Sequence, residues 1–255
     1  KRLLPKIIEI NIFRIQFEFP EPAMKSLIFI LALISITHAV TLNCSFELAY
    51  GINLHNTYAC YRPIVLNVND GENLTAVYGT HESGKSHSDV KLLTIGDAHH
   101  LLFFPRLIEN FFPNLEAIEF WNTSISTLTG DELNPFPNLF WFQILWNPDL
   151  DRIPGDFFDS TPLMRHVTFY DNNIKVVGEN FLNNQPNLIY LNFGYNYCIS
   201  RSASNDTAQI QALIEDIRSN CATTTVGPPC GNKNQIICDL HERNLNLLAI
   251  NDEMM

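Results

Sequence analysis

Hydrophobic and polar positions recur along the middle of the chain with a period of 24 to 25 residues. Four segments open with Pro113, Pro137, Pro162 and Pro186, which lie 24, 25 and 24 residues apart. In each segment apolar residues occupy positions that we number 1, 4 and 6, with position 1 two residues after the proline. A weaker copy begins at Val90. A fixed period in this range is typical of stacked repeats rather than of a globular core.

The spacing within each copy predicts a short β-strand. Positions 4 and 6 point to one face of an extended chain, while positions 3, 5 and 7 point to the other. No single coil can bury its own apolar face, so stability must come from the stacking of neighbouring coils. The pattern therefore predicts parallel strands that begin near Val90, Leu115, Leu139, Met164 and Leu188.

The segments that return from one strand to the next share a second pattern. A large apolar residue lies six positions before the next repeat, and a pair of glycine and an acidic residue precedes it. The apolar residues are Leu133, Phe158 and Leu182, and the pairs are Gly130-Asp131, Gly155-Asp156 and Gly178-Glu179. Such short returns favour irregular or 3₁₀ turns over long helices.

Position 9 carries an amide in the later copies, at Asn147, Asn172 and Asn196. An asparagine amide both donates and accepts, so it can satisfy main-chain groups of the neighbouring coil where the chain leaves the strand. Ala98 and Thr123 hold this position in the first two copies, and we expect those turns to be less regular.

The cysteines flank the repeats. Cys44 and Cys60 precede them, Cys198 and Cys221 follow them, and the tail holds Cys230 and Cys238. An even count confined to the flanks indicates a disulfide framework, most simply paired between neighbours in sequence, although six cysteines allow 15 pairings. A loop of the size from Cys44 to Cys60 stabilises by about 3 kcal/mol in the chain-entropy model. The tail cysteines would alternatively link two chains into a dimer.

The start of the chain predicts secretion. Met24-Lys25-Ser26 precedes ten uncharged residues, 27–36, and Thr37-His38-Ala39 follows, which is the layout of a signal peptide, 24–39. Residues 1–23 are interpreted as leader, untranslated or cloning-derived sequence.

Removing five basic and three acidic side chains with residues 1–39 would change the net charge from −11 to −13. An acidic protein of this kind is a poor ligand for nucleic acid, and no later segment has the pattern of a membrane span.

The remaining chain divides into an N-terminal cap, 40–89, leucine-containing repeats, 90–197, a C-terminal cap, 198–221, and a tail, 222–255. Four glycosylation sequons agree with an extracellular address. They begin at Asn43, Asn73, Asn122 and Asn205, of which Asn73 and Asn205 are the first candidates. Asn122 occupies position 8, where a glycan would mask the rim of the free strand face.

One segment, Gly79 to Ser86, matches the phosphate-loop pattern G-x-x-x-x-G-K-[ST]. That chemistry requires a helix that starts at the lysine, because phosphates bind the amides at its N-terminus. The residues that follow alternate into the first repeat, so we interpret the segment as a glycine-rich turn.

His81, His87, His99 and His100 lack metalloprotease spacing and are interpreted as exposed loop histidines. We therefore predict no enzyme activity, cofactor or metal.

The face formed by positions 3, 5 and 7 concentrates large amphipathic side chains. All three tryptophans of the chain fall on it or at its rim. Tyr and Trp dominate binding hot spots, and an exposed aromatic patch normally marks a contact surface. The alternative is that some rings pack under the caps or shield neighbouring strands. The candidate binding residues are Glu119, Trp121, Trp141, Gln143, Trp146, His166, Tyr170, Tyr190 and Tyr195.

Residues 90–198 resemble a short extracellular leucine-rich repeat array, and the flanking cysteine pairs resemble its caps. The resemblance implies an α/β-type solenoid with a short curved parallel sheet, an irregular or 3₁₀ convex side and disulfide-bearing caps. Secreted insect proteins of this type are similar in layout, including mosquito immune factors that partner complement-like proteins and carry a C-terminal coiled coil. In this tail an amphipathic start is limited to Ile237, Leu240, Leu247 and Leu248.

The resemblance implies a secreted, non-catalytic module that binds an extracellular protein through its concave face, in innate immunity or in the extracellular matrix. The alternative is a binder of glycans or small molecules that uses Trp121, Trp141 and Trp146 as stacking platforms. On the first hypothesis, truncation of Trp141 weakens binding more than it lowers stability, whereas truncation of Phe142, a core position, does the reverse.

Overall fold

A computed structural model describes residues 40–49, 56–66, 73–183 and 185–221. The chain divides into two units, Lys1–Thr37 and His38–Met255, and all described residues belong to the second. The predicted leader, the signal peptide and the tail with Cys230 and Cys238 lie outside the described residues. Within the described ranges, every helix is too short or too polar to cross a bilayer.

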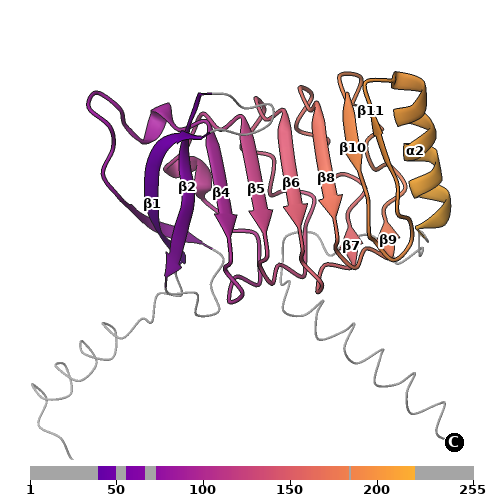
Figure 1. The fold of residues 1–255 in the computed structure, drawn as a ribbon, viewed down its shortest axis with the longest axis horizontal. Coiled ribbons are helices and arrows are strands. Elements are labelled where there is room, and N and C mark those ends of the chain that lie inside the picture. The colour runs from indigo at the N-terminus through magenta and orange to yellow at the C-terminus, as the bar shows by residue number, and fades with distance from the viewer. Residues whose placement is uncertain (1–39, 50–55, 67–72, 184, 222–255) are drawn as a thin grey trace, which may run out of the picture. The chain divides into compact units, whose positions relative to one another are not determined.

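Five strands of the repeats form a parallel sheet (Figure 1). They are β4 (Leu92–Gly96), β5 (Ala117–Trp121), β6 (Trp141–Leu145), β8 (His166–Tyr170) and β10 (Tyr190–Asn192). Each strand begins two residues after position 1 of its copy, so the predicted parallel strands are confirmed. Together with the four return segments between them, they make a parallel β-solenoid of four turns.

The register of the sheet pairs equal positions of successive copies. Trp141 at position 3 lies between Ala117 and His166, and Gln143 at position 5 lies between Glu119 and Thr168. A one-residue slip would exchange the two faces of every strand. The alignment of the copies in the sequence therefore matches the register of the structure, and it decides which side chains become neighbours.

Strands of the caps extend this sheet at both ends. At the start, β2 (Thr57–Leu66) pairs in parallel with β4, β1 (Val40–Ala49) pairs antiparallel with β2, and β3 (Leu74–Tyr78) lies at the edge and pairs in parallel with β1. At the other end, β11 (Ser202–Ser204) pairs antiparallel with β10, and α2 (Thr207–Asn220) follows it.

Two disulfides secure these caps. Cys44 and Cys60 join β1 to β2, and Cys198 and Cys221 join the segment after β10 to the end of α2. Both predicted pairings are confirmed. Each bridge lies at one end of the stack, where there is no further coil to cover the apolar interior.

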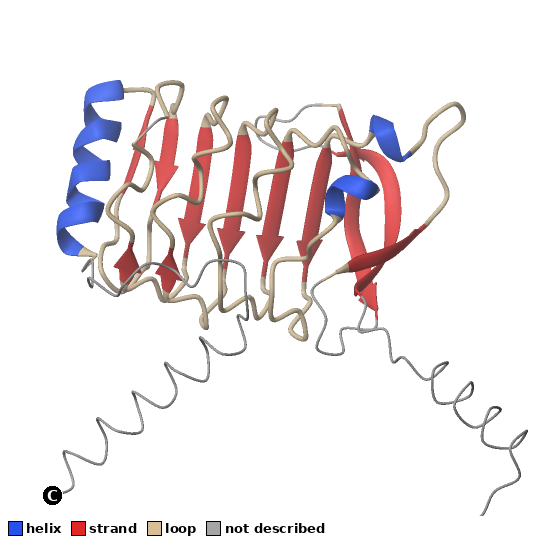
Figure 2. Ribbon diagram, turned by 180° about the vertical axis from the view of Figure 1, so that it is seen from behind, coloured by secondary structure: helices blue, strands red, loops and turns tan. Residues whose placement is uncertain are grey.

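The return segments lie behind the sheet (Figure 2). They contain turns, the 3₁₀ helix η2 (Ile108–Asn110) and the short strands β7 (Arg152–Ile153) and β9 (Val176–Val177), which pair with each other. The irregular or 3₁₀ returns are thus confirmed, whereas the α/β-type description is confirmed only in part, because the described part of the returns holds no α-helix and the helix α2 (Thr207–Asn220) lies in the C-terminal cap. A side chain at Gly178 would overlap the backbone of Gly155. Such close approach leaves no room for a helix about 10 Å across.

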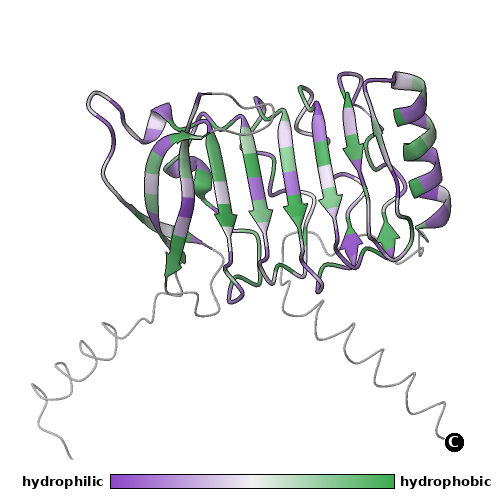
Figure 3. Cartoon of the chain, in the orientation of Figure 1, coloured by the Kyte–Doolittle hydropathy of each residue, from purple (hydrophilic) through white to green (hydrophobic). Residues whose placement is uncertain are grey.

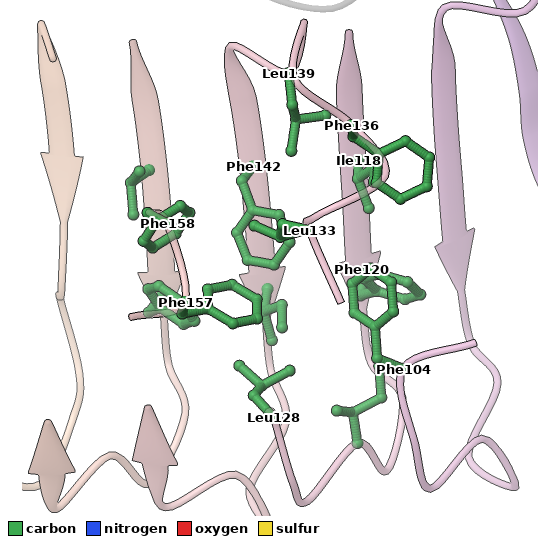
Figure 4. Close-up of a cluster of buried hydrophobic side chains, with 14 of the residues drawn as sticks. Phe104, Ile118, Phe120, Leu128, Leu133, Phe136, Leu139, Phe142, Phe157 and Phe158 are labelled. Carbon is green, nitrogen blue, oxygen red and sulfur yellow. The ribbon is translucent and has the colours of Figure 1, made fainter. Parts of the chain in front are cut away.

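Phenylalanine rings are the largest side chains buried between the sheet and the returns, where they pack with leucine and isoleucine (Figure 4). The ring centroids of Phe142 and Phe157 lie 5.2 Å apart, and those of Phe157 and Phe158 lie 4.9 Å apart. The predicted apolar residues Leu133, Phe158 and Leu182 are all buried. In the middle of β5 and β6 a hydrophilic residue at position 5 lies between the hydrophobic residues at positions 4 and 6 (Figure 3). Position 5 therefore points to the open face, opposite this core.

Asparagines at position 9 connect the coils as predicted. The Asn172 side chain accepts from the backbone N–H of Asn147 at 2.8 Å and donates to the carbonyl of Ile144 at 3.0 Å. Asn196 likewise accepts from the N–H of Ile174 at 3.2 Å. Thr123 joins this ladder through a hydrogen bond to Asn147. These amides satisfy backbone groups that the turn would otherwise leave buried and unpaired.

We expect Asn172→Ala to lower the free energy of unfolding by about 2 to 4 kcal/mol, because it leaves a buried donor and a buried acceptor without partners. Asn187→Ala is the control. The Asn187 amide also donates to a backbone carbonyl, that of Pro162 at 3.2 Å, but it is exposed, so water replaces it. Chemical denaturation measures both variants, and equal losses would contradict the buried ladder.

A buried carboxylate lies in the second return segment. Glu132 accepts from the backbone N–H of Thr129 at 2.6 Å, while its other oxygen, Oε2, has no hydrogen-bond partner among the described residues. Burial raises the pKa of Glu132 to about 7. The neighbouring Asp131 differs, because hydrogen bonds from Arg106 hold its pKa below the ordinary value.

The raised pKa of Glu132 makes stability depend on pH. The folded state holds its proton more tightly than the unfolded state, so this stabilisation is complete below about pH 4.5 and is lost as the pH rises through about 7. Glu132→Gln keeps the acceptor oxygen and removes the titration. Between pH 5 and pH 8 we expect the unfolding free energy of the wild type to fall by about 2 to 3 kcal/mol more than that of the variant. Parallel pH profiles of the two proteins would refute this assignment.

Candidate binding surface on the open face of the sheet

The open face, which positions 3, 5 and 7 form opposite the return segments, divides into two bands. The first lies at the starts of the strands and is apolar and buried. It forms a second hydrophobic cluster, separate from the main core, that contains Ala49, Ala59, Leu92, Ala117 and Trp141.

Trp141 belongs to this buried band, with 7 % of its surface exposed. Its ring stacks on His166 with centroids 4.3 Å apart, and its indole N–H donates to Glu119 Oε1 at 2.9 Å. The expectation of a solvent-facing indole at this position is therefore wrong. The reason is that a small residue, Ala117, pairs with Trp141 on one side and a flat ring lies on the other.

The groups around Trp141 form a connected stack. Burial raises the pKa of Glu119, although hydrogen bonds from Trp141 and Thr94 partly oppose the shift. Burial also lowers the pKa of His166, and the Arg165 charge acts in the same direction. The Tyr190 ring follows at 5.7 Å from His166. This band is built from mutual contacts, and it offers a partner little free surface.

Four rings at the ends of the strands form the second band, which we call the aromatic row. Trp121 and Trp146 meet edge-on with centroids 6.4 Å apart, and Tyr170 and Tyr195 meet edge-on at 5.2 Å. Trp146 is 46 % exposed and Tyr195 is 66 % exposed. The structure thus places four of the predicted binding residues together at one rim of the open face, and Gln143 lies half-buried between the two bands.

Two glycines at position 7 make room for Trp121 and Tyr170, the two rings of the row that also occupy position 7. A side chain at Gly96 would overlap the indole of Trp121. At the other end, a Cβ on Gly194 would lie 3.1 Å from the Tyr170 ring. Each of these two rings therefore lies over the glycine of the neighbouring strand, Trp121 over Gly96 and Tyr170 over Gly194, and packs against its backbone.

Position 8 has a left-handed backbone in all five copies. The φ angles are 53° at Asp97, 51° at Asn122, 55° at Trp146, 54° at Asp171 and 58° at Tyr195. This conformation lets the position 8 N–H donate to the next coil, as Trp146 does to the carbonyl of Tyr170 at 3.0 Å.

Asparagine and aspartate tolerate a left-handed backbone, but bulky residues there are outliers that cost about 1 to 2 kcal/mol each. Two of the five copies nevertheless carry a large aromatic residue at position 8, Trp146 and Tyr195. Both side chains are exposed, so the strain is not offset by burial in the core. Backbone strain that persists at exposed residues points to a functional role.

The N-terminal cap extends the row. The guanidinium carbon of Arg62 lies 5.0 Å from the Trp121 ring centroid and 5.1 Å from that of Tyr61. An open depression of about 290 Å³ adjoins Trp121 and is lined in part by Arg62, Ile64, Asp97 and His100. Sequence reasoning missed Tyr61 and Arg62, because the cap lies outside the repeat period. It also missed Tyr197, which is 77 % exposed at the end of the last copy.

The sequons differ in accessibility. Asn43, Asn73 and Asn205 are exposed, whereas Asn122 is half-buried next to Trp121. The Asn122 amide donates to Asp97 Oδ1 at 2.5 Å. A glycan on Asn122 would therefore project from the rim of the open face, beside the aromatic row.

The glycine-rich segment has a structural explanation. Strand β3 precedes it, but a three-residue 3₁₀ helix, η1 (His87–Asp89), follows where a phosphate loop requires an α-helix. Lys85 lies 5.5 Å from the Tyr58 ring centroid and pairs with Asp89 at 3.7 Å. The lysine is thus engaged within the cap.

Two of the predicted loop histidines are not exposed. His81 stacks on Phe46 with centroids 3.7 Å apart, contacts His87 at 4.8 Å and shares a hydrogen bond with the Tyr58 hydroxyl at 3.0 Å. Burial is the main reason that the pKa of His81 is lowered. His99 and His100 are exposed, as expected. In the described ranges, no three His, Cys, Asp or Glu side chains gather as metal ligands would.

Comparisons with known proteins find matches among solved structures alone. No known family and no curated protein matches the sequence. A solved structure described as a TLR13–ssRNA13 complex matches with 12 % identity and a TM-score of 0.28, over 48 % of this chain and 25 % of that chain. This chain therefore spans about a quarter of the matched one. The repeat architecture rests on the parallel register described above, which makes the protein a four-turn parallel β-solenoid with disulfide-bonded caps.

Proposed function

We propose that this protein is a secreted, non-catalytic recognition module that binds a protein partner through the aromatic row. The observation that carries the proposal is the pair of exposed aromatic residues, Trp146 and Tyr195, on a left-handed backbone. A fold selected for stability alone would favour Asn, Asp or Gly at these positions. Large amphipathic rings that stand out from a rigid sheet are typical of binding hot spots.

Secretion is part of the proposal. Disulfides persist in oxidising compartments, and the two cap bridges fit an extracellular protein. Three exposed sequons agree with that location. A role in innate immunity or in the extracellular matrix, which the resemblance to insect immune factors suggests, depends on the identity of the partner.

The aromatic row favours a protein over a glycan. Sugar rings stack on open aromatic faces, but the Trp121 and Trp146 planes meet at 87° and Arg62 covers one face of Trp121. Trp141, the third platform of the glycan hypothesis, is buried. Separate rings at varied angles suit the side chains of a polypeptide better than a linear oligosaccharide.

We expect the double substitution Trp146→Asn/Tyr195→Asn to abolish partner binding while leaving stability unchanged or raising it by about 1 kcal/mol, because asparagine relieves the left-handed strain. Immobilised protein would capture the partner from extracellular fluid, and mass spectrometry would identify it. Leu163→Asn is the control, because Leu163 is as exposed as Trp146, at 46 %, but lies outside the row. Undiminished capture by the double variant would reject the aromatic row as the binding surface.

Trp141→Ala should behave differently from substitutions in the row. Because its ring is buried between Ala117 and His166, we expect a loss of about 3 kcal/mol in unfolding free energy, close to the effect of Phe142→Ala. Thermal and chemical unfolding of both variants test this. A Trp141→Ala protein with wild-type stability and lost binding would restore the role that the sequence alone predicted for this residue.

A further inference from the structure

Charge along position 8 of the repeats suggests the chemistry of the partner. In strand order this position reads Asp97, Asn122, Trp146, Asp171 and Tyr195, so that Asp171 lies between the two exposed rings. Hydrogen bonds hold these neighbours in place. The N–H of Trp146 donates to Tyr170 at 3.0 Å, and that of Asp171 donates to Gly194 at 2.8 Å. Neighbouring strands lie about 4.8 Å apart, which sets the distance between successive members of the series.

The Asp171 carboxylate has no ion-pair or hydrogen-bond partner in the described part of the chain, and it is exposed. The arginines at the two ends of the row are already engaged, because Arg62 lies over Trp121 and Arg201 pairs with Asp216. Across the same described residues, no cation lies over Trp146, Tyr170 or Tyr195. The middle of the row therefore combines free aromatic faces with an unneutralised negative charge.

Arg62 already makes a cation–π contact with one ring of the aromatic row, Trp121. Its guanidinium is held between Tyr61 and Trp121, with centroid distances of 5.1 Å and 5.0 Å. Cations within about 6 Å of an aromatic centroid are attracted by the ring, and arginine is the most common example. The same chemistry is available at Trp146 and Tyr195, with the added attraction of Asp171.

We propose that the partner docks through a basic segment that places an arginine or lysine side chain between Trp146 and Tyr195, against Asp171. This inference rests on the proposed protein-binding function and specifies its ligand. The net charge of −11 would steer such a segment toward the protein from a distance. The contact combines cation–π attraction with an ion pair, so an arginine has more to gain here than a neutral side chain.

An N-acetylated peptide of alternating arginine and glycine is a direct probe. Its titration is followed by tryptophan fluorescence and by calorimetry. A matched peptide with citrulline in place of arginine keeps the shape and most hydrogen-bond donors but removes the charge. We expect the arginine peptide to bind and the citrulline peptide to fail, with affinity for the former falling as salt is raised.

Asp171→Asn isolates the proposed contact, because asparagine also tolerates the left-handed backbone. We expect it to weaken the arginine peptide about fivefold or more. Asp159→Asn, at an exposed position in a return segment, removes the same charge far from the row and should have no effect. Equal weakening by the two variants would overturn the inference, as would equal binding of both peptides or binding of a neutral chitin oligosaccharide in place of the arginine peptide.

Capture of the natural partner separates this inference from the function on which it rests. If Trp146→Asn/Tyr195→Asn loses the captured protein while Asp171→Asn retains it at full affinity, the row binds protein but the basic segment is refuted. If Asp171→Asn also weakens capture in a salt-dependent way, both are supported. Full capture by both variants would refute both.

Discussion

The structure depends on one constraint: a coil of this chain cannot satisfy its own backbone or bury its own apolar face, so each coil is completed by the next. At position 8 the N–H of each of the first four copies donates to the following strand, and at position 9 the side chains of Asn172 and Asn196 bond backbone groups of the coil before them. The contacts follow the repeat period of 24 to 25 residues. They hold the strands in one register, and the two disulfide-bonded caps close the ends, where no further coil is present.

The same register builds the candidate site. Equal positions lie beside one another, so rings from separate copies gather into a row without being close in sequence. The inner side chains of the open face, around Trp141, become a buried stack that stiffens the sheet. The outer ones, at the ends of the strands, remain exposed on a backbone that cannot shift without breaking the hydrogen bonds between coils. Rigid presentation of aromatic residues limits the entropy lost on binding.

Much of this arrangement could be predicted from the sequence, because the repeat period is strong. The period predicted the parallel strands and their register, and the flanking cysteines predicted both described disulfides. The burial of Trp141 could not be foreseen, since it depends on which side chains its neighbours in other coils bring, Ala117 on one side and His166 on the other. Arg62 and Tyr61 were missed for a related reason, because the cap follows no repeat. A signal for the left-handed position was present in Asp97, Asn122 and Asp171, which share position 8.

The central claim is the register that buries Trp141 and exposes Trp146, and hydrogen exchange of the three indole N–H groups tests it most directly. In a ¹⁵N-resolved NMR experiment on the intact protein, the account predicts strong protection for Trp141, whose indole N–H is bonded to Glu119, and rapid exchange for Trp146. Substitution of each tryptophan by phenylalanine assigns the signals. A protected Trp146 with a freely exchanging Trp141 would contradict the account, because it would make the band around Trp141 the exposed part of the open face and the aromatic row the buried part.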